Sequence, residues 1–236
     1  MISINKQVFT GNNITIINGR FVSCGLTANP QKFDERKEED CSNIDKIAID
    51  STVADVNVSV SDSSKIEAHF YGVAEINGDF NFEVRAENRE LRIVLQYTGN
   101  YCINGNLKLD INIPQKTFKV ISAKSSSADF TLNKGVSTDY LKVKTQSGDL
   151  ESNATVNNIY VSTMSGDIDL CIDATNDIIV DVSTMSGNVS AEFNNIAHTN
   201  LSASSMSGDV KNHHKESNGY TADVDISTMS GNIRIR

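Results

Sequence analysis

The sequence contains no tryptophan and only two prolines, Pro30 and Pro114, among its 236 residues. Aromatic residues make up 6% and hydrophobic residues 39% of the chain, which is below the usual apolar share of a globular domain. A compact globule of this length normally has more large side chains to fill its core. An elongated fold needs fewer, because its core is thin.

Other absences narrow the function and the location. There is no apolar run of 18 residues, so no membrane span is predicted. The first residues lack a basic region followed by an apolar stretch, so we expect no secretory signal and a cytoplasmic location. The net charge of −9 disfavours nucleic acid as a partner, because an acidic chain does not neutralise phosphates.

Motifs for metals and catalysis are also missing. The four cysteines have no CxxC spacing, which favours free thiols in a reducing compartment: Cys24, Cys41, Cys102 and Cys171. His213 and His214 form the only histidine cluster, and no further ligand follows at short spacing, so we expect a surface position. The sequence predicts no metal, no cofactor and no catalytic residues.

What the chain does contain is a repeat. The motif Ser-Thr/Ser-Met-Ser-Gly-Asp/Asn occupies residues 162–167, 183–188, 204–209 and 227–232. Its glycines are 21, 21 and 23 residues apart, and every methionine except Met1 lies in it. Upstream the motif weakens but keeps its phase, at residues 145–150, 126–130, 104–107, 77–80 and 53–56.

Apolar residues alternate with polar ones on both sides of each motif, as in Ile159 and Val161 before it and Ile168, Leu170 and Ile172 after it. A period of two with recurrent glycine predicts strands and excludes helices. We therefore predict an all-β fold: a single-stranded β-solenoid (β-helix) over residues 47–236, most regular over 115–236, with coils of about 18–24 residues. In such a stack, residues at equivalent positions of successive coils lie above one another.

The motif has a structural role at the corner of each coil. Glycine permits a positive φ, Asp or Asn can bond neighbouring backbone N–H groups, and methionine is predicted to point inward and fill the corner. Met185→Ala would then cost about 2–5 kcal/mol. The predicted corner residues are Gly148, Asp149, Met164, Gly166, Asp167, Met185, Gly187, Asn188, Met206, Gly208, Asp209, Met229, Gly231 and Asn232.

The remaining segments are less regular. Residues 1–25, with the turn signal Asn18-Gly19, predict a strand or hairpin cap, and the charged residues 26–46 predict a loop or linker. Residues 64–97 suit a wider coil or a hairpin. The chain stops inside a repeat strand at 233–236, which predicts an open edge that is either blunted by its arginines or paired with another molecule.

Three chemical interpretations of the repeat compete with a structural one. An Asp/Asn column could hold cations, but Asn replaces Asp freely, which favours a hydrogen-bonded turn ladder. Exposed Ser-Thr rows suggest ice binding, but the coil lengths vary too much for a flat array. One coil concentrates acidic residues, which we expect to form a solvated face rather than a catalytic pair: Asp167, Asp169, Asp173, Asp177 and Asp181.

The repeated Ser-x-Ser-Gly-Asp/Asn-Ile/Val corner and the strand from Leu107 to Pro114 resemble the bacterial putative-adhesin domain family. The resemblance covers about residues 47–236 and implies a β-solenoid domain without assigned catalytic residues. We expect a non-enzymatic binding or scaffold protein that contacts a protein or a glycan through its solenoid face. The alternatives are a polysaccharide-active β-helix enzyme and self-assembly into a homo-oligomer through the C-terminal coil.

Overall fold

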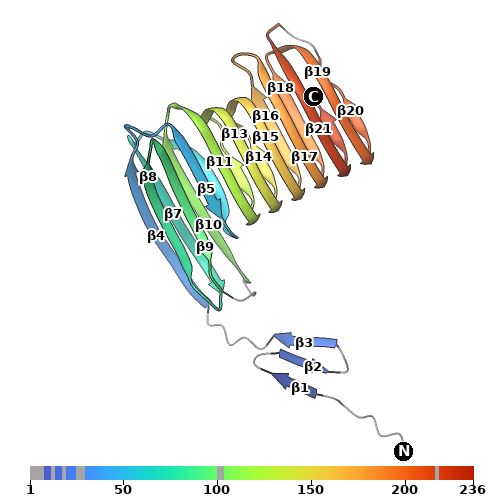
Figure 1. Ribbon diagram of the computed structural model, residues 1–236. Coiled ribbons are helices and arrows are strands. Elements are labelled where there is room, and N and C mark those ends of the chain that lie inside the picture. Colours follow the sequence, from blue (N-terminus) through green and yellow to red (C-terminus); the bar gives the residue numbers. More distant parts are fainter. Residues whose placement is uncertain (1–7, 12–13, 18–19, 25–29, 100–103, 216–217) are drawn as a thin grey trace, which may run out of the picture.

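The computed structural model describes residues 8–236 except 12–13, 18–19, 25–29, 100–103 and 216–217. Within these ranges it describes side chains from residue 30 onward, apart from that of Asn104. All regular elements in this part of the chain are β-strands (Figure 1). The strands are β1 (Val8–Gly11), β2 (Ile14–Ile17), β3 (Arg20–Cys24), β4 (Pro30–Asp40), β5 (Lys46–Ser51), β6 (Asp55–Ser61), β7 (Lys65–Glu75), β8 (Phe80–Glu87), β9 (Glu90–Tyr97), β10 (Asn104–Pro114), β11 (Thr117–Ser127), β12 (Phe130–Leu132), β13 (Ser137–Ser147), β14 (Leu150–Ser152), β15 (Thr155–Ser165), β16 (Ile168–Asp173), β17 (Ile178–Ser186), β18 (Val189–Asn194), β19 (Ile196–Ser207), β20 (Val210–Asn212), β21 (Tyr220–Ser230) and β22 (Ile233–Ile235).

From β11 onward the chain alternates between two open sheets that enclose the core. Each coil places a long strand in a nine-stranded sheet, ordered β19-β21-β17-β15-β13-β11-β5-β9-β8. It then places a shorter strand in a ten-stranded sheet, ordered β20-β22-β18-β16-β14-β12-β6-β10-β7-β4. The coils pair in parallel and in register, as the repeat predicts, which produces the stacked shape in Figure 1.

The inward residues of successive coils stack into apolar rows. Leu141 pairs with Ile159, Ile159 with Val180, and Val180 with Val224, and all four are buried. Burial of such rows is the main stabilising term, because a single coil cannot cover its own apolar face.

The N-terminal side of the solenoid is antiparallel and differs from the prediction. Residues 30–40, expected within a loop or linker, form β4, which pairs antiparallel with β7 as the edge of the ten-stranded sheet. The charged residues that predicted a linker belong instead to an edge strand. Charged side chains on an edge strand hinder its pairing with further strands. Strands β8 and β9 form a hairpin whose turn residues Asn88 and Arg89 have positive φ.

Strands β1, β2 and β3 form a separate antiparallel sheet. The turn signal Asn18-Gly19 lies outside the described residues, and the role of a cap for residues 1–25 stays a prediction.

The corner glycines have φ between 143° and 156°, a region that side chains rarely adopt. A Cβ on Gly187 would lie 2.0 Å from the carbonyl oxygen of Gly166 in the coil below. Glycine is therefore needed both for the conformation and for the close approach of the coils. Gly105, proposed as an upstream corner, instead lies within β10, where it opposes Ala74 of β7.

The prediction that methionine points inward is wrong. Met164, Met185, Met206 and Met229 are 54%, 48%, 82% and 49% exposed. The residue before methionine is the inward one in three of these coils, where it is buried: Thr163, Thr184 and Thr228. Because these threonines are buried, they cannot form the exposed array that ice binding would require.

The C-terminal coil is not the open end of the solenoid. Strand β21 pairs with β17 on one side and β19 on the other, and β22 lies between β18 and β20. The last coil is thus inserted between the two coils that precede it, and the outer edge is formed by β19 and β20 (Figure 1). The arginines of residues 233–236 therefore do not blunt this edge.

We expect Gly187→Ala to lower the free energy of unfolding by more than about 2 kcal/mol, because it combines a strained φ with a clash against a backbone oxygen. Ser183→Ala, at an exposed position of the same coil, is the control and should change it by less than about 0.5 kcal/mol. Urea denaturation measures both. Equal stabilities would contradict the tight corner.

The exposed methionines lead to a second prediction. Met185→Ala should cost less than about 1 kcal/mol, rather than the larger loss expected for a buried side chain. The adjacent Thr184 is buried, and its hydroxyl has no hydrogen-bond partner among the described residues, so Thr184→Val should be neutral or stabilising.

Thr163→Val is the matched control, because the Thr163 hydroxyl donates to the carbonyl oxygen of Ser165 at 3.2 Å. Its loss should cost about 0.5–1.5 kcal/mol. A large loss in the free energy of unfolding for Met185→Ala, in the same denaturation series, would indicate that methionine points inward after all.

Candidate binding surfaces

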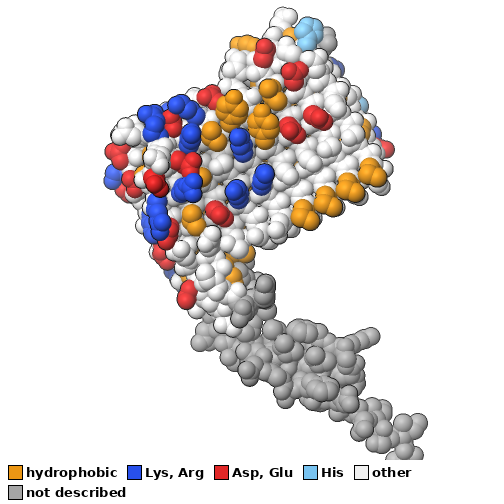
Figure 2. Space-filling model, viewed as in Figure 1, with side chains coloured by type: hydrophobic (Ala, Val, Ile, Leu, Met, Phe, Trp, Pro, Cys, Tyr) orange, Lys and Arg blue, Asp and Glu red, His pale blue; other side chains and the backbone are white. Residues whose placement is uncertain are grey.

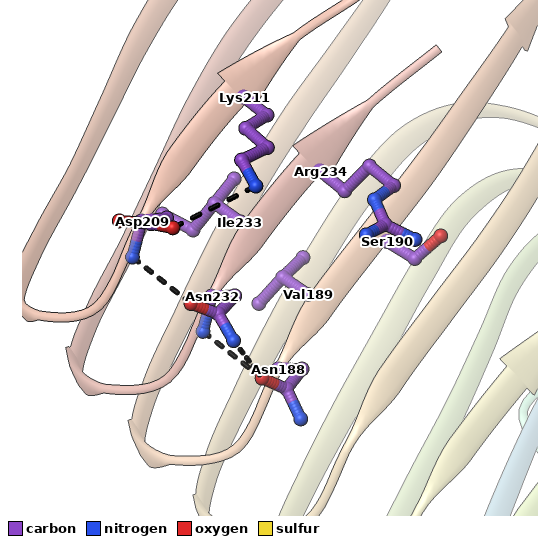
Figure 3. Close-up of a pocket in the computed structure, with 8 residues that line it drawn as sticks. All are labelled: Asn188, Val189, Ser190, Asp209, Lys211, Asn232, Ile233 and Arg234. Carbon is purple, nitrogen blue, oxygen red and sulfur yellow. Dashed lines mark hydrogen bonds and ion pairs between the residues drawn. The ribbon is translucent and has the colours of Figure 1, made fainter.

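The residue after each corner glycine forms a ladder of hydrogen bonds between coils. The backbone N–H of Asp149 donates to Asp129 Oδ1 at 2.8 Å, and that of Asp167 donates to Asp149 Oδ1 at 2.7 Å. Asn188 continues the ladder by donating to Asp167 Oδ1. At the C-terminal end the order is Asn188, Asn232 and Asp209, which follows the inserted coil (Figure 3).

This ladder acts between coils rather than within one turn. From Asp129 to Asn232, each side chain has an oxygen engaged by the next coil, and Asn serves as well as Asp because only an acceptor is needed. Among the described residues, no group of three His, Cys, Asp or Glu side chains is arranged to hold a metal ion. The geometry is that of a structural ladder.

The outer face of the nine-stranded sheet has a tyrosine–lysine surface, which we define as Tyr140, Lys142, Lys144, Tyr160 and Lys124. Tyr140 is 41% exposed, and Tyr160 is half-buried on the neighbouring strand. The Lys142 ammonium lies 5.9 Å from the centroid of each tyrosine ring, within reach of a cation–π interaction.

Strand register explains how these side chains meet. Lys142 pairs with Tyr160 across β13 and β15, and Lys124 pairs with Lys144 across β11 and β13. Because outward residues recur every second position, three lysines and two tyrosines from three coils share one face. A shallow hollow beside them is lined by Lys142, Lys144, Tyr160, Ser162, Asp181 and Ser183.

Charge changes sign across this face. Towards β17 and β21 the lysines give way to Asp181, Asp223 and Asp225, with the exposed Ile179 between the two regions. Figure 2 shows basic, hydrophobic and acidic side chains following one another in that order across the stacked strands. A ligand lying across the coils would meet cations at one end and carboxylates at the other.

The four methionines form a row of their own along the corner edge. Register pairs Thr163 with Thr184 and Ser165 with Ser186, which places Met164 beside Met185. The same argument gives the spatial order 164, 185, 229, 206. Figure 2 shows a row of hydrophobic side chains at this edge of the solenoid.

A polar hollow lies on the ten-stranded sheet, lined in part by Asp55, Tyr71, Lys108, Asp110 and Asp129. Burial raises the pKa of the Asp55 carboxyl; the hydrogen bond from the Asp129 backbone opposes this effect, and the Asp129 charge adds to it. The Tyr71 hydroxyl donates to Asp110 Oδ2 at 3.0 Å. Burial and this hydrogen bond raise the pKa of Tyr71.

The acidic coil does not form a single site. Asp167 belongs to the corner ladder, Asp173 accepts from Asn194, and Asp177 accepts from the backbone of Thr221. Asp181 lies on the outer face of the other sheet. Asp169 is exposed on β16 of the ten-stranded sheet. The five residues are thus divided among separate structural contacts and surfaces.

His213 is exposed, whereas His214 is half-buried and its Nε2 atom has no hydrogen-bond partner among the described residues. The His214 ring lies edge-on to Phe193, and its Nδ1 is 3.3 Å from the carbonyl oxygen of Arg236. Cys41 and Cys171 are free thiols, and burial raises the pKa of Cys171, as do the carboxylates around it. The side chains of Cys24 and Cys102 lie outside the described residues.

No helix in the described part of the chain is long and apolar enough to cross a membrane.

The fold and its surfaces define an all-β repeat protein built from two stacked sheets. The chain belongs to the Toastrack DUF4097 family, whose model matches residues 44–236. This confirms the resemblance to a putative-adhesin family of unknown function. Among curated proteins, none matches the chain.

Solved structures align with this chain at low sequence identity. A "putative cell adhesion protein" from Clostridium sporogenes aligns with a TM-score of 0.55 and 14% identity, over 87% of this chain and 99% of its own. A "putative adhesin" from Bacteroides fragilis aligns with a TM-score of 0.40 and 16% identity, over 87% and 98% of the two chains. A "putative lipid binding protein" from Parabacteroides distasonis has a TM-score of 0.33 and 15% identity, over 89% and 98%.

We expect Asp167→Ala to lower the free energy of unfolding by about 1–2 kcal/mol, because the backbone N–H of Asn188 loses its acceptor. Asp167→Asn keeps an acceptor and should be nearly neutral. Thermal melts should also be unchanged by added Ca²⁺. A calcium-dependent rise in melting temperature that Asp167→Asn abolishes would show a cation ladder instead.

Proposed function

We propose that this protein is a non-enzymatic binding protein that recognises an acidic glycan through the tyrosine–lysine surface. The observation that carries the proposal is the placement of Lys142 between two tyrosine rings, with Lys124 and Lys144 beside it. Tyrosine faces offer flat apolar area to a sugar ring, and the lysines offer charge to its carboxylate or sulfate groups.

The shape of the face supports an extended ligand. The hollow beside Tyr160 is shallow, and the surrounding sheet is regular, so a small molecule would remain largely in solvent there. A chain of sugars could instead follow the coils and contact several rows at once. The basic region is local on a chain of net charge −9, so we expect attraction to depend on this one surface.

The Clostridium sporogenes relative is described only as a "putative cell adhesion protein", and a cell-adhesion protein would need a ligand-binding surface. A cytoplasmic location stays a prediction from the sequence.

Binding to an array of acidic and neutral glycans tests the proposal. We expect retention of acidic glycans that weakens with salt, and a loss of affinity of about tenfold or more for Lys142→Glu and for Tyr140→Ala. Tyr220→Ala is the matched control, because Tyr220 is also 41% exposed but lies outside the tyrosine–lysine surface. It should bind like the unchanged protein.

Two results would contradict the proposal: no acidic glycan is bound, or the substitutions at Lys142 and Tyr140 leave binding unchanged. If the same substitutions instead abolish the binding of a protein, the tyrosine–lysine surface is a binding site whose ligand is a protein and not a glycan. Circular dichroism of each variant checks that the fold is intact.

The polar hollow favours one alternative, a polysaccharide-active enzyme. It combines the raised pKa of Asp55 with two further carboxylates, as acid–base catalysis requires. However, Asp110 accepts from Tyr71, while Asp55 and Asp129 accept backbone N–H groups, so these carboxylates already have structural roles. Measurable turnover of a polysaccharide that Asp55→Asn abolishes would favour the enzyme.

A homo-oligomer is the other alternative, and it would use the edge formed by β19 and β20. Leu201 and Ala203 are only half-buried there, and Val210 is 42% exposed, whereas their counterparts in inner coils are buried. An unpaired edge with apolar side chains can add another strand. Light scattering that shows a monomer at high concentration would exclude this alternative.

A further inference from the structure

The methionine row repeats an exposed apolar side chain through four coils of the solenoid. The chain has five methionines, and four of them lie in this row. No methionine contributes to the buried core of the described residues, which is filled by Ile, Leu, Val, Phe and Ala. In the part of the chain that the structure describes, a flexible apolar side chain that usually fills cores is thus found only where it is exposed.

The outward row beside the methionine row also repeats one residue in these coils: Ser162, Ser183, Ser227 and Ser204. The row beyond the serines shows that exposure alone does not select methionine. In the same four coils that row contains Tyr160, Asp181, Asp225 and Ser202. Side chains there vary freely, and the coils still stack. In the methionine row the thioether is present in each coil, whereas the adjoining coil has Gln146 at this position.

The geometry brings the sulfur atoms within reach of a common ligand. Neighbouring strands lie about 4.8 Å apart, so Met185 has Met164 on one side and Met229 on the other. Methionine has three rotatable side-chain bonds, so adjacent thioethers can converge without movement of the backbone. Met206 extends the row beyond Met229 and is 82% exposed.

Thioethers are soft, neutral ligands that select Cu(I) over the hard or borderline ions preferred by oxygen and imidazole. They do not titrate, so protons do not compete for them. The residues on either side of each methionine in the sequence are Ser and Thr, which place no cation beside the row.

We propose that the methionine row is a binding site for a soft monovalent metal ion, Cu(I), with Ag(I) as its air-stable analogue. The thioethers of Met185 and Met229 form the centre of the site, and Met164 or Met206 completes it from either end. Binding forms sulfur–metal coordination bonds without a change in oxidation state. This inference is independent of the glycan surface, which lies on other rows.

Methionine-methyl NMR on the full chain tests the proposal. The protein is labelled at the methionine ε-methyl carbon and titrated with Ag(I) beyond the equivalents taken up by its four cysteines. We expect the methyl resonances of Met185 and Met229 to shift with saturation near one further equivalent. The resonance of Met1, which is outside the row, should move little.

The matched variant is Met185→Leu with Met229→Leu, which keeps apolar side chains in the row but removes two sulfur atoms. We expect at least a tenfold loss of Ag(I) affinity at the remaining Met164 and Met206 resonances. Competition with a chromogenic Cu(I) chelator, under anaerobic conditions, should show the same loss. Ile179→Leu, an exposed substitution on the same sheet, is the control and should bind like the unchanged protein.

The proposal is overturned if Met185 and Met229 do not shift, or if all five methionines shift alike. It is also overturned if the double leucine variant binds as tightly as the unchanged protein. In that last case the row would be an apolar strip rather than a metal site.

Discussion

At the corners of the solenoid, the carbonyl oxygen of one glycine occupies the space that a Cβ atom on the corner glycine of the neighbouring coil would need. The oxygen of Gly148 is 2.1 Å from a Cβ built on Gly166, and that of Gly166 is 2.0 Å from one on Gly187. The sequence of these contacts continues from Gly187 to Gly231 and then to Gly208. This close approach keeps the coils in register, and the Asp/Asn ladder beside it satisfies the adjoining backbone N–H groups.

Register at the corner has consequences for the rest of each coil. Inward residues form continuous apolar rows, so the core tolerates little change. Outward residues form rows that the core does not constrain. One outward row can therefore combine tyrosine with aspartate, while another repeats methionine through four coils. The surfaces that we propose for binding thus arise from the alternation that builds the core.

The repeat made much of this architecture predictable. The spacing of the glycines and the alternation around Val161 are enough to predict stacked strands over the matched region. The inward orientation predicted for methionine rested on its hydrophobicity and not on its position in the alternation of inward and outward residues. The alternation of Ile159 and Val161 continues to Thr163, which is inward, and so leaves Met164 on the surface. The same phase would have placed Lys142 and Tyr160 together, since both are outward residues of neighbouring coils.

Other features could not be obtained from the pattern. The final coil lies between its two predecessors. All three coils present nearly the same motif, so the local sequence does not favour one stacking order over another. Strand β4 could not be predicted because its charged residues are compatible with a sheet edge as well as with a linker. The cluster around Asp55 and Asp110 combines the parallel pairing of β6 with β10 and the antiparallel pairing of β7 with β10, which adds Tyr71. The repeat gives no signal for the antiparallel pairing.

Cysteine pairs in the methionine row test the stacking order and the outward orientation together. Met185→Cys with Met229→Cys places two thiols on adjacent coils, within the Cα separation of 4.4–6.8 Å that a disulfide requires. Met185→Cys with Met206→Cys places them about two strand spacings apart, beyond that range. After mild oxidation, peptide mapping by mass spectrometry should find the 185–229 disulfide and not a 185–206 disulfide. A 185–206 disulfide without the 185–229 one would contradict the inserted coil and the corner contacts on which this account rests.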